Sequence, residues 1–172
     1  ESAFSMSGNQ FTTYAVKGQG VCLKRYQSVT ERVYAISGIT APGELYYKTQ
    51  KTPYKSDDVI LFLDHLLEKI NGHIHTVWDN ASIHFSKKIK TYLEQEIPSK
   101  RLTLYALPRY CPELNPDEQV WNHLKNTDLL RKEFTKRTQL VKELNNQLDK
   151  LRKMPELIAN FFRHEEIQFT YS

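Results

Sequence analysis

The sequence contains few cysteines and no apolar stretch long enough to cross a membrane. Its longest apolar run, Val59 to Leu63, falls far short of the ~20 residues that a bilayer requires, and no signal-peptide pattern is present. The two cysteines, Cys22 and Cys111, lie far apart and lack metal-ligand spacing. These absences argue against a membrane span or a disulfide-stapled secreted domain within the sequence, and they favour a reducing cytoplasm.

The sequence also lacks a large excess of charge of one sign. Its formal net charge is +4, with 26% charged and 40% apolar residues among 172, which is ordinary for a single soluble globular domain. A mildly basic chain permits nucleic-acid binding without arguing for it, because a solvated surface with a small lysine excess would look the same. The Gly18-Gln19-Gly20 turn is not a phosphate loop, since it lacks the lysine and the following helix of such loops.

The first third of the chain predicts antiparallel strands. Segments rich in threonine, valine and tyrosine favour strands over Thr12 to Val16, Gly20 to Tyr26, Arg32 to Ile39 and Glu44 to Thr49. The last two flank a Thr40-Ala41-Pro42-Gly43 turn and are expected to form a hairpin.

The rest of the chain predicts helices that alternate with parallel strands. Apolar spacing and capping residues indicate a helix from Ser56, as N-cap, to Asn71-Gly72; a strand over His73 to Trp78; a helix capped by Ser86 and stopped by Pro98; a buried strand over Leu102 to Leu107; and a helix from Pro116, after Asn115 as N-cap, through Lys125. Two more helices are expected, from Thr138 and from Pro155. This order is typical of a mixed α/β fold with a C-terminal helical extension.

Two acidic residues, Asp79 and Glu118, stand at the ends of these elements. Asp79 follows the strand that ends at Trp78, and Glu118 lies in the first turn of the helix that starts at Pro116. Carboxylates at such termini can converge on a divalent ion, which would suit phosphoryl chemistry. Structural readings also exist: Asp79 could form an Asx turn, and Glu118 could return to the amide of Asn115 in a capping box.

The segments around the two acids resemble the second and third acidic motifs of transposases that share an Asp, Asp, Glu triad, in the branch of mariner-like elements and related bacterial insertion sequences. The resemblance is carried by Asp79-Asn80-x-x-x-His84 and by Leu107-Pro108-x-Tyr110-x-Pro112-Glu113-Leu114-Asn115-Pro116-x-Glu118-x-Val120-Trp121. Arg109 and Cys111 stand where the family usually has Pro and Ser. The spacing between the acids is slightly long, and we expect the extra residues in a loop near Gln95 to Arg101.

The resemblance implies a ribonuclease H-like mixed sheet flanked by helices, and an active site that holds two Mg²⁺ or Mn²⁺ ions. Asp79 and Glu118 would be catalytic metal ligands. The first Asp of the triad would directly precede Glu1, so we expect a catalytic domain truncated at its N-terminus and inactive as this polypeptide. In the alternative reading, Glu1 itself substitutes as a ligand. The expected division is a catalytic domain over residues 1–128 and a helical extension over residues 129–172.

Several polar residues near the acids are expected to support the site. Asn80, His84 and Asn115 would support the metal ligands without binding the ion themselves. His84 could position a phosphate or an attacking water, or it could bond a backbone carbonyl. Asp117 and Glu113 are interpreted as surface acids. His73 and His75 form a His-x-His-x-x-x-Asp pattern with Asp79 that occurs in some zinc hydrolases. No further His or Cys cluster completes such a site, so solvent-facing histidines are favoured.

Basic residues flank both motifs and are candidates for contacts to a DNA backbone. They are Lys87, Lys88, Lys125, Arg131 and Lys132. A solvated helix face explains them equally well.

The resemblance implies that the parent protein is a DNA transposase that cleaves and joins phosphodiesters at transposon ends. Its expected partners are transposon-end and target DNA, with a second copy of the chain as a further candidate, and no membrane. It would act in the cytoplasm, at the nucleoid in a bacterium. The alternative is a non-enzymatic remnant that binds DNA or self-associates. A junction resolvase is disfavoured by the segment from Asn115 to Trp121.

Overall fold

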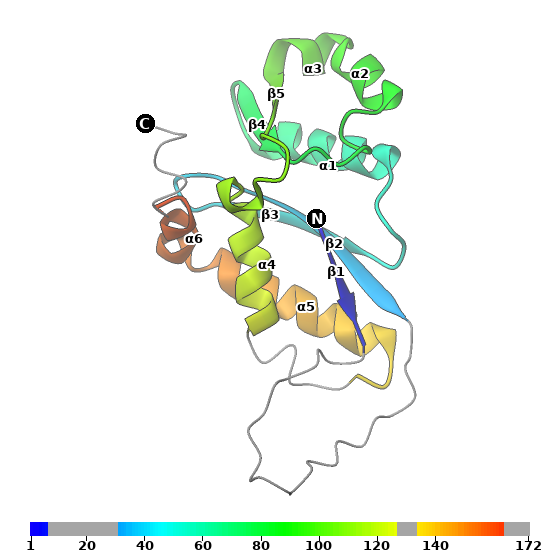
Figure 1. Ribbon diagram of the computed structural model, residues 1–172, viewed down its shortest axis with the longest axis vertical. Helices are drawn as coiled ribbons and strands as arrows, with labels where there is room; N and C mark the ends of the chain where they lie inside the picture. The colour runs from blue at the N-terminus through cyan, green and yellow to red at the C-terminus, as the bar shows by residue number, and fades with distance from the viewer. Residues whose placement is uncertain (7–30, 127–133, 164–172) are drawn as a thin grey trace, which may run out of the picture.

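The computed structural model describes residues 1–6, 31–126 and 134–163, which form two β-sheets with helices packed around them (Figure 1). The expected strands at Thr12 to Val16 and Gly20 to Tyr26 lie outside the described residues, as do Arg131 and Lys132. Across the described ranges, no helix combines the length and apolar content needed to cross a bilayer.

The first sheet is antiparallel, with strand order β1-β2-β3. Its strands are β1 (Ser2–Ser5), β2 (Arg32–Ile39) and β3 (Leu45–Gln50). The predicted hairpin is confirmed, because β2 and β3 pair from Tyr34↔Gln50 to Ile39↔Leu45. Gly43 lies in the connecting turn at a φ of 101°, a conformation that favours glycine.

The alternation of β2 buries both faces of this sheet. Val33 and Ala35 contribute to one apolar cluster, and Ile36, which points the opposite way, contributes to the other. We call the first cluster the α5-side core; its buried members are Phe4, Met6, Val33, Ala35, Leu45, Val120, Trp121, Leu124, Leu140, Leu144, Leu148, Leu151 and Ile158. We call the second the α1-side core; its buried members are Ile36, Tyr54, Val59, Phe62, Leu63, Leu66, Leu67, Ile74, Trp78, Ile89, Tyr92 and Leu102.

The second sheet pairs β4 (Ile74–Trp78) in parallel with β5 (Leu102–Ala106), so both strands end at the same edge. Three helices accompany it in the α1-side half of the molecule: α1 (Ser56–Lys69), α2 (Lys87–Leu93) and α3 (Glu96–Arg101). The predicted cap of α2 is confirmed, since the Ser86 side chain accepts a hydrogen bond from the amide of Ile89.

Four expectations for this half are wrong. Pro98 does not stop the preceding helix but lies in the first turn of α3, where a missing amide hydrogen costs little. The segment in which a loop was expected, Gln95 to Arg101, therefore forms the helix α3. Ser56 is the first residue of α1, not its N-cap, and its hydroxyl donates to the Ile83 carbonyl. The strand β5 is only partly buried, because 46% of Tyr105 is exposed.

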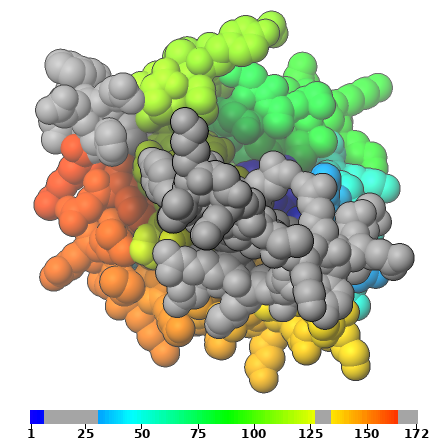
Figure 2. Space-filling view, turned by 60° about the horizontal axis from the view of Figure 1, so that its bottom comes forward, coloured from blue at the N-terminus to red at the C-terminus, as the bar shows by residue number. Residues whose placement is uncertain are grey.

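The C-terminal helices belong to the same core as the first sheet. A short 3-10 helix (Pro112–Leu114) precedes α4 (Asp117–Asn126), and α5 (Arg137–Arg152) and α6 (Pro155–Phe161) follow. The predicted C-terminal helices are thus confirmed, and their apolar residues lie in the α5-side core. In the space-filling view, yellow and orange residues of α5 form the lower edge and green residues of the β4–β5 half lie above (Figure 2).

Candidate active site

Asp79 is placed by the end of β4. It directly follows Trp78, the last residue of the strand, and one of its carboxylate oxygens accepts a hydrogen bond from the amide of Ala81 at 3.0 Å. The Asx-turn reading is therefore correct. It is compatible with a functional role, because this bond fixes the carboxylate direction while half of the side chain stays exposed (52%).

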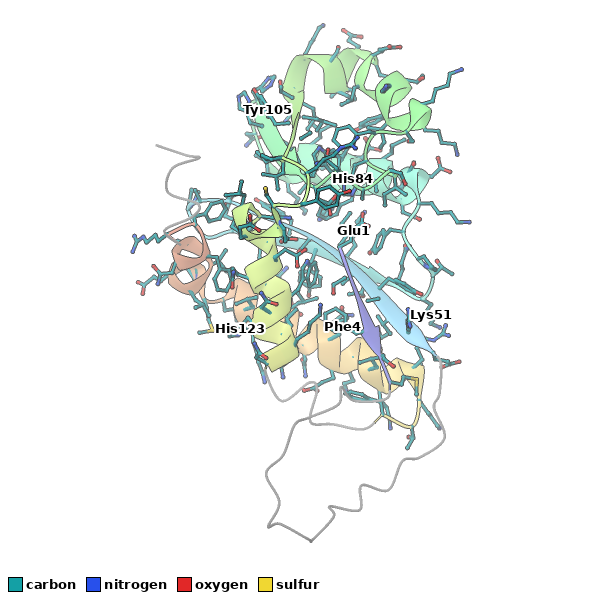
Figure 3. The ribbon with its side chains drawn as sticks, viewed as in Figure 1. Glu1, Phe4, Lys51, His84, Tyr105 and His123 are labelled. Atoms are coloured by element: carbon teal, nitrogen blue, oxygen red, sulfur yellow. The ribbon has the colours of Figure 1, made fainter. Side chains whose placement is uncertain are left out.

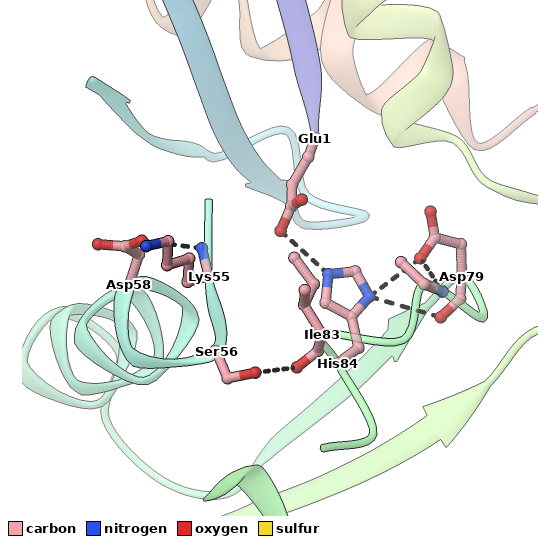
Figure 4. Close-up of polar contacts among 8 residues, drawn as sticks. Glu1, Lys55, Ser56, Asp58, Asp79, Ile83 and His84 are labelled. Atoms are coloured by element: carbon pink, nitrogen blue, oxygen red, sulfur yellow. Dashed lines mark hydrogen bonds and ion pairs between the residues drawn. The ribbon is translucent and has the colours of Figure 1, made fainter. Parts of the chain in front are cut away.

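His84 lies between two carboxylates from distant parts of the chain (Figure 4). Its Nδ1 is 2.9 Å from Oδ1 of Asp79, and its Nε2 is 3.1 Å from Oε1 of Glu1. The ring is buried and stacks on Trp78, with the ring centroids 4.6 Å apart. A contact of 3.5 Å between Nδ1 and the Asp79 carbonyl adds the backbone bond foreseen for this residue. His84 thus holds Asp79 from behind.

The proton on His84 is stabilised by these neighbours. Burial by itself would lower the pKa of His84, but the hydrogen bonds to Asp79 and Glu1 outweigh it and raise that pKa to about 9. The same bond from His84 is the main cause that lowers the pKa of Asp79 to about 2. At neutral pH the imidazolium therefore donates from both ring nitrogens, and Asp79 is a carboxylate.

Glu118 is placed by the start of α4. The side chain of Asn115 accepts a hydrogen bond from the amide of Asp117 at 3.1 Å, which gives Asn115 the predicted capping role. The amide of Asn115 donates to the Pro112 carbonyl at 3.0 Å, so it does not serve the Glu118 carboxylate. The prediction of a capping box at Glu118 is therefore wrong, and the Glu118 carboxylate is not engaged by the amide of Asn115.

Asp79 and Glu118 line the same cleft, which has a volume of about 490 Å³. Burial raises the pKa of Glu118, and the charges of Asp117 and Asp79 raise it further. A bound cation would offset the negative charge that raises the pKa of Glu118, and carboxylate oxygens are the ligand atoms that Mg²⁺ and Mn²⁺ prefer. The chemistry of these two donors therefore suits a divalent ion. The cleft is lined by Asp79, Asn80, Leu107, Pro108, Arg109, Tyr110, Cys111, Pro112, Asn115 and Glu118.

Asn80 ties together the two parts that carry the acids. Its side-chain amide donates to the Leu107 carbonyl at 2.6 Å, and the amide of Leu107 donates to the Trp78 carbonyl at 2.9 Å. The loop that leads from β5 to Glu118 is therefore anchored beside Asp79.

Asp117 was expected to be a surface acid, and this expectation is wrong. Its side chain is partly buried and accepts a hydrogen bond from the Ser37 hydroxyl at 2.6 Å, which links α4 to β2. Burial raises the pKa of Asp117. A helical position one residue before Glu118 gave no sign of this contact, because it depends on a strand 80 positions away. Glu113 is exposed, as expected.

The basic residues are not all brought to the cleft. Lys87 and Lys88 lie on α2 and line a separate hollow with Asp57 and Asp64, where Lys88 forms a salt bridge to Asp57 at 2.6 Å. Lys125, in the last turn of α4, is close enough for its charge to oppose the rise in the pKa of Glu118.

His73 and His75 make local contacts on the exposed side of β4. His73 contacts the Lys100 carbonyl and the Thr103 hydroxyl, and His75 contacts the Tyr105 hydroxyl at 3.2 Å. Within the described residues, no group of three or more His, Cys, Asp or Glu side chains is arranged to hold a metal ion. The described residues therefore offer no complete zinc site at these histidines.

The family model described as DDE superfamily endonuclease matches residues 1–141. The chain belongs to this family. The resemblance read from the two acidic motifs is thereby confirmed. No curated protein matches the chain.

The DDE fold of this chain is also found in solved structures of the Mos1 transposase. The Mos1 transposase paired-end complex with left transposon end is 15% identical at a TM-score of 0.64, covering 92% of this chain and 52% of that chain. The mariner Mos1 paired end complex with Mg is 16% identical at 0.64, covering 93% and 53%. The complex with Mn is 17% identical at 0.62, covering 92% and 53%.

This DDE chain spans about half the length of those Mos1 chains. The likeness confirms the predicted ribonuclease H-like mixed α/β fold. The expected domain division after residue 128 lies in 127–133, outside the described residues, and it stays a prediction.

Proposed function

We propose that this chain is the catalytic part of a DNA transposase, which cleaves and joins phosphodiesters with a divalent ion held by Asp79 and Glu118. The observation that carries the proposal is that these two acids, which come from different elements, line one cleft. Membership of the DDE superfamily endonuclease family supports it. So do the names of the Mos1 complexes, which mention transposon ends, strand transfer, Mg and Mn.

The chain's own residues would divide the work in the cleft. Asp79 and Glu118 would supply the ligand oxygens; His84 fixes the direction of the Asp79 carboxylate, and Asn80 anchors the loop that leads to Glu118. A bound divalent ion would supply Lewis-acid chemistry, lowering the pKa of an attacking water and stabilising the leaving oxygen. Arg109 is exposed at the cleft and offers a cation to the DNA backbone.

Further contacts to DNA would come from Lys125, Lys87 and Lys88, and from Arg131 and Lys132, which lie outside the described residues. The salt bridge of Lys88 to Asp57 involves two exposed side chains, so a phosphate could replace the carboxylate at little cost. We also propose that two copies of the chain act together on a pair of DNA ends; the printed name of one Mos1 complex mentions paired ends.

The test is strand nicking of supercoiled plasmid by the protein at its full encoded length, with Mn²⁺ present. Glu118→Gln is expected to slow nicking by at least about a hundredfold, because a carboxylate that holds the divalent ion is lost. Glu113→Gln makes the same chemical change at an exposed position outside the cleft and should nick like the wild type.

Nicking at the wild-type rate by Glu118→Gln would contradict the assignment of this residue. A full-length protein that binds DNA but neither nicks it nor binds Mn²⁺ would favour the alternative of a non-enzymatic, DNA-binding remnant.

A further inference from the structure

Tyr110 is the most exposed of the large apolar and aromatic side chains in the described part of the chain. Its side chain is 96% exposed, although an aromatic ring gains free energy by burial. It lines the same cleft as Asp79 and Glu118. An aromatic ring presented to solvent beside two candidate metal ligands is a contact surface without a partner inside the described residues.

The backbone of Tyr110 is also strained. Its φ of 61° lies in the left-handed region, and within the described residues it is the one non-glycine residue with a positive φ. Side chains with a Cβ avoid this region, and Asn and Gly tolerate it best. Folding alone would therefore favour Asn or Gly at this position. Strain of this kind persists where function needs a side chain in a fixed direction.

The loop around Tyr110 is held at both ends. On one side, Leu107 is buried and bonded to Trp78 and Asn80, next to Asp79. On the other side, the amides of Leu114 and Asn115 donate to the carbonyls of Cys111 and Pro112, and the chain then enters α4 and reaches Glu118. The ring is thus carried by a short loop fixed to both elements that bear the acids, with prolines at 108 and 112 to limit its backbone freedom.

We propose that Tyr110 stacks on an unpaired nucleobase next to the phosphodiester bound in the cleft, and so positions a DNA end for the reaction. This inference rests on the proposed function. Bases within a duplex are already stacked on both faces, so an exposed ring can stack only on a base that is unpaired or turned out of the helix. The exposed guanidinium of the neighbouring Arg109 can hold the adjoining phosphate. Tyr110 would therefore select DNA ends with unpaired nucleotides over blunt duplex.

The test compares binding of two DNA probes by the chain in Ca²⁺: a short duplex with an unpaired single-stranded end, and the same duplex made blunt. The unpaired end carries a 2-aminopurine, whose fluorescence falls on stacking. Tyr110→Asn is expected to weaken binding of the unpaired end roughly 5- to 100-fold, to leave blunt duplex binding nearly unchanged, and to abolish the fluorescence loss. Tyr110→Phe keeps the ring and should behave as wild type.

Two controls separate stacking from damage to the fold. Because Asn tolerates the left-handed backbone, Tyr110→Asn should melt at or slightly above the wild-type temperature. Tyr105→Asn removes another exposed tyrosine, on β5 and away from Glu1 and His84 in Figure 3, and should bind both probes like the wild type. Together these results would support a base contact specific to Tyr110.

The remaining outcomes overturn the inference in distinguishable ways. If the wild type binds DNA and Tyr110→Asn binds both probes as tightly as the wild type, the stacking role is wrong while the proposed function stands. The same conclusion follows if Tyr110→Asn loses affinity for both probes by the same factor. An equal loss in Tyr105→Asn would also overturn it. If the wild type binds neither probe, the proposed function fails together with the stacking role.

Discussion

At the scale of single residues, His84 explains how a half-exposed carboxylate can be held in one direction. Oδ1 of Asp79 accepts the turn bond from the amide of Ala81, and the same oxygen contacts Nδ1 of His84. The buried imidazolium of His84, stacked on Trp78 and bonded to Asp79, adds a rigid second anchor. Partners behind a metal ligand orient it and thereby set its affinity for the ion.

His84→Asn should therefore weaken Mn²⁺ binding by about 10- to 100-fold without abolishing it, because Asp79 and Glu118 remain. Calorimetric titration of the purified chain measures the affinity, and thermal unfolding shows that the variant is folded. His75→Asn, at an exposed histidine on β4, is the matched control and should bind Mn²⁺ like the wild type. Equal affinities for His84→Asn and the wild type would show that His84 does not orient the ligand.

The residues of the site were predictable only in part from the sequence. Asp79 and Glu118 follow from their motifs, and Asn115 from its position before Pro116. The contact of Asp117 with Ser37 was missed because it joins distant segments. The sequence does not reveal the exposure and the positive φ of Tyr110. A tyrosine side chain is usually at least partly buried, and its backbone rarely adopts the left-handed conformation.

At the scale of elements, the β2–β3 turn fits tightly against the start of α6. Gly43 lies in this turn, and a Cβ added to it would come within 2.1 Å of the Pro155 carbonyl oxygen. Gly72, at the end of the segment between α1 and β4, has a similar φ of 87° but open space around it. A substitution at Gly72 therefore measures the free-energy cost of the left-handed backbone alone. A substitution at Gly43 adds the cost of a steric clash with α6.

Gly72→Ala is expected to destabilise the fold by about 1–2 kcal/mol, because alanine disfavours the left-handed backbone and meets no other obstacle. Gly43→Ala should cost roughly 3 kcal/mol or more, since α6 must also move away from the turn. Urea unfolding of both variants gives the two values. Equal losses would show that α6 does not pack against the β2–β3 turn in this way.

Sequence patterns identified most of the described elements, but not all of their limits. Apolar spacing located α1, α5 and α6, the Asn115-Pro116 pair located α4, and the turn residues located the β2–β3 hairpin. The sequence does not reveal α3, because Pro98 suggests the end of a helix, whereas proline is also tolerated in a first helical turn. The exposure of Tyr105 was missed because an apolar strand looks the same whether one or two of its faces are covered.

At the scale of the whole molecule, the C-terminal helices share the core of the first sheet. Leu144 on α5 is fully buried in the α5-side core together with Trp121, whereas Trp78 lies in the α1-side core. The sheet β1-β2-β3 contributes to both cores, through Val33 on one face and Ile36 on the other. We therefore expect the two halves to unfold as one cooperative unit.

Leu144→Ala should destabilise the chain by about 2–5 kcal/mol, the usual cost of a cavity in a packed core. The measurement uses a Trp121→Phe background, in which Trp78 is the remaining tryptophan. Trp78 fluorescence and far-UV circular dichroism should then report the same urea midpoint, lowered equally by the mutation. If Leu144→Ala left the urea midpoint of Trp78 fluorescence unchanged, the α1-side half would fold independently of α5.

The central claim is that Asp79 and Glu118 bind one divalent site, and Mn²⁺ titration of the chain followed by electron paramagnetic resonance tests it most directly. Asp79→Asn and Glu118→Gln are each expected to weaken Mn²⁺ binding by at least about tenfold, because each removes a ligand charge. Asp57→Asn and Glu113→Gln, the matched changes at exposed acids outside the cleft, should bind like the wild type. Wild-type Mn²⁺ affinity in either Asp79→Asn or Glu118→Gln would contradict the account.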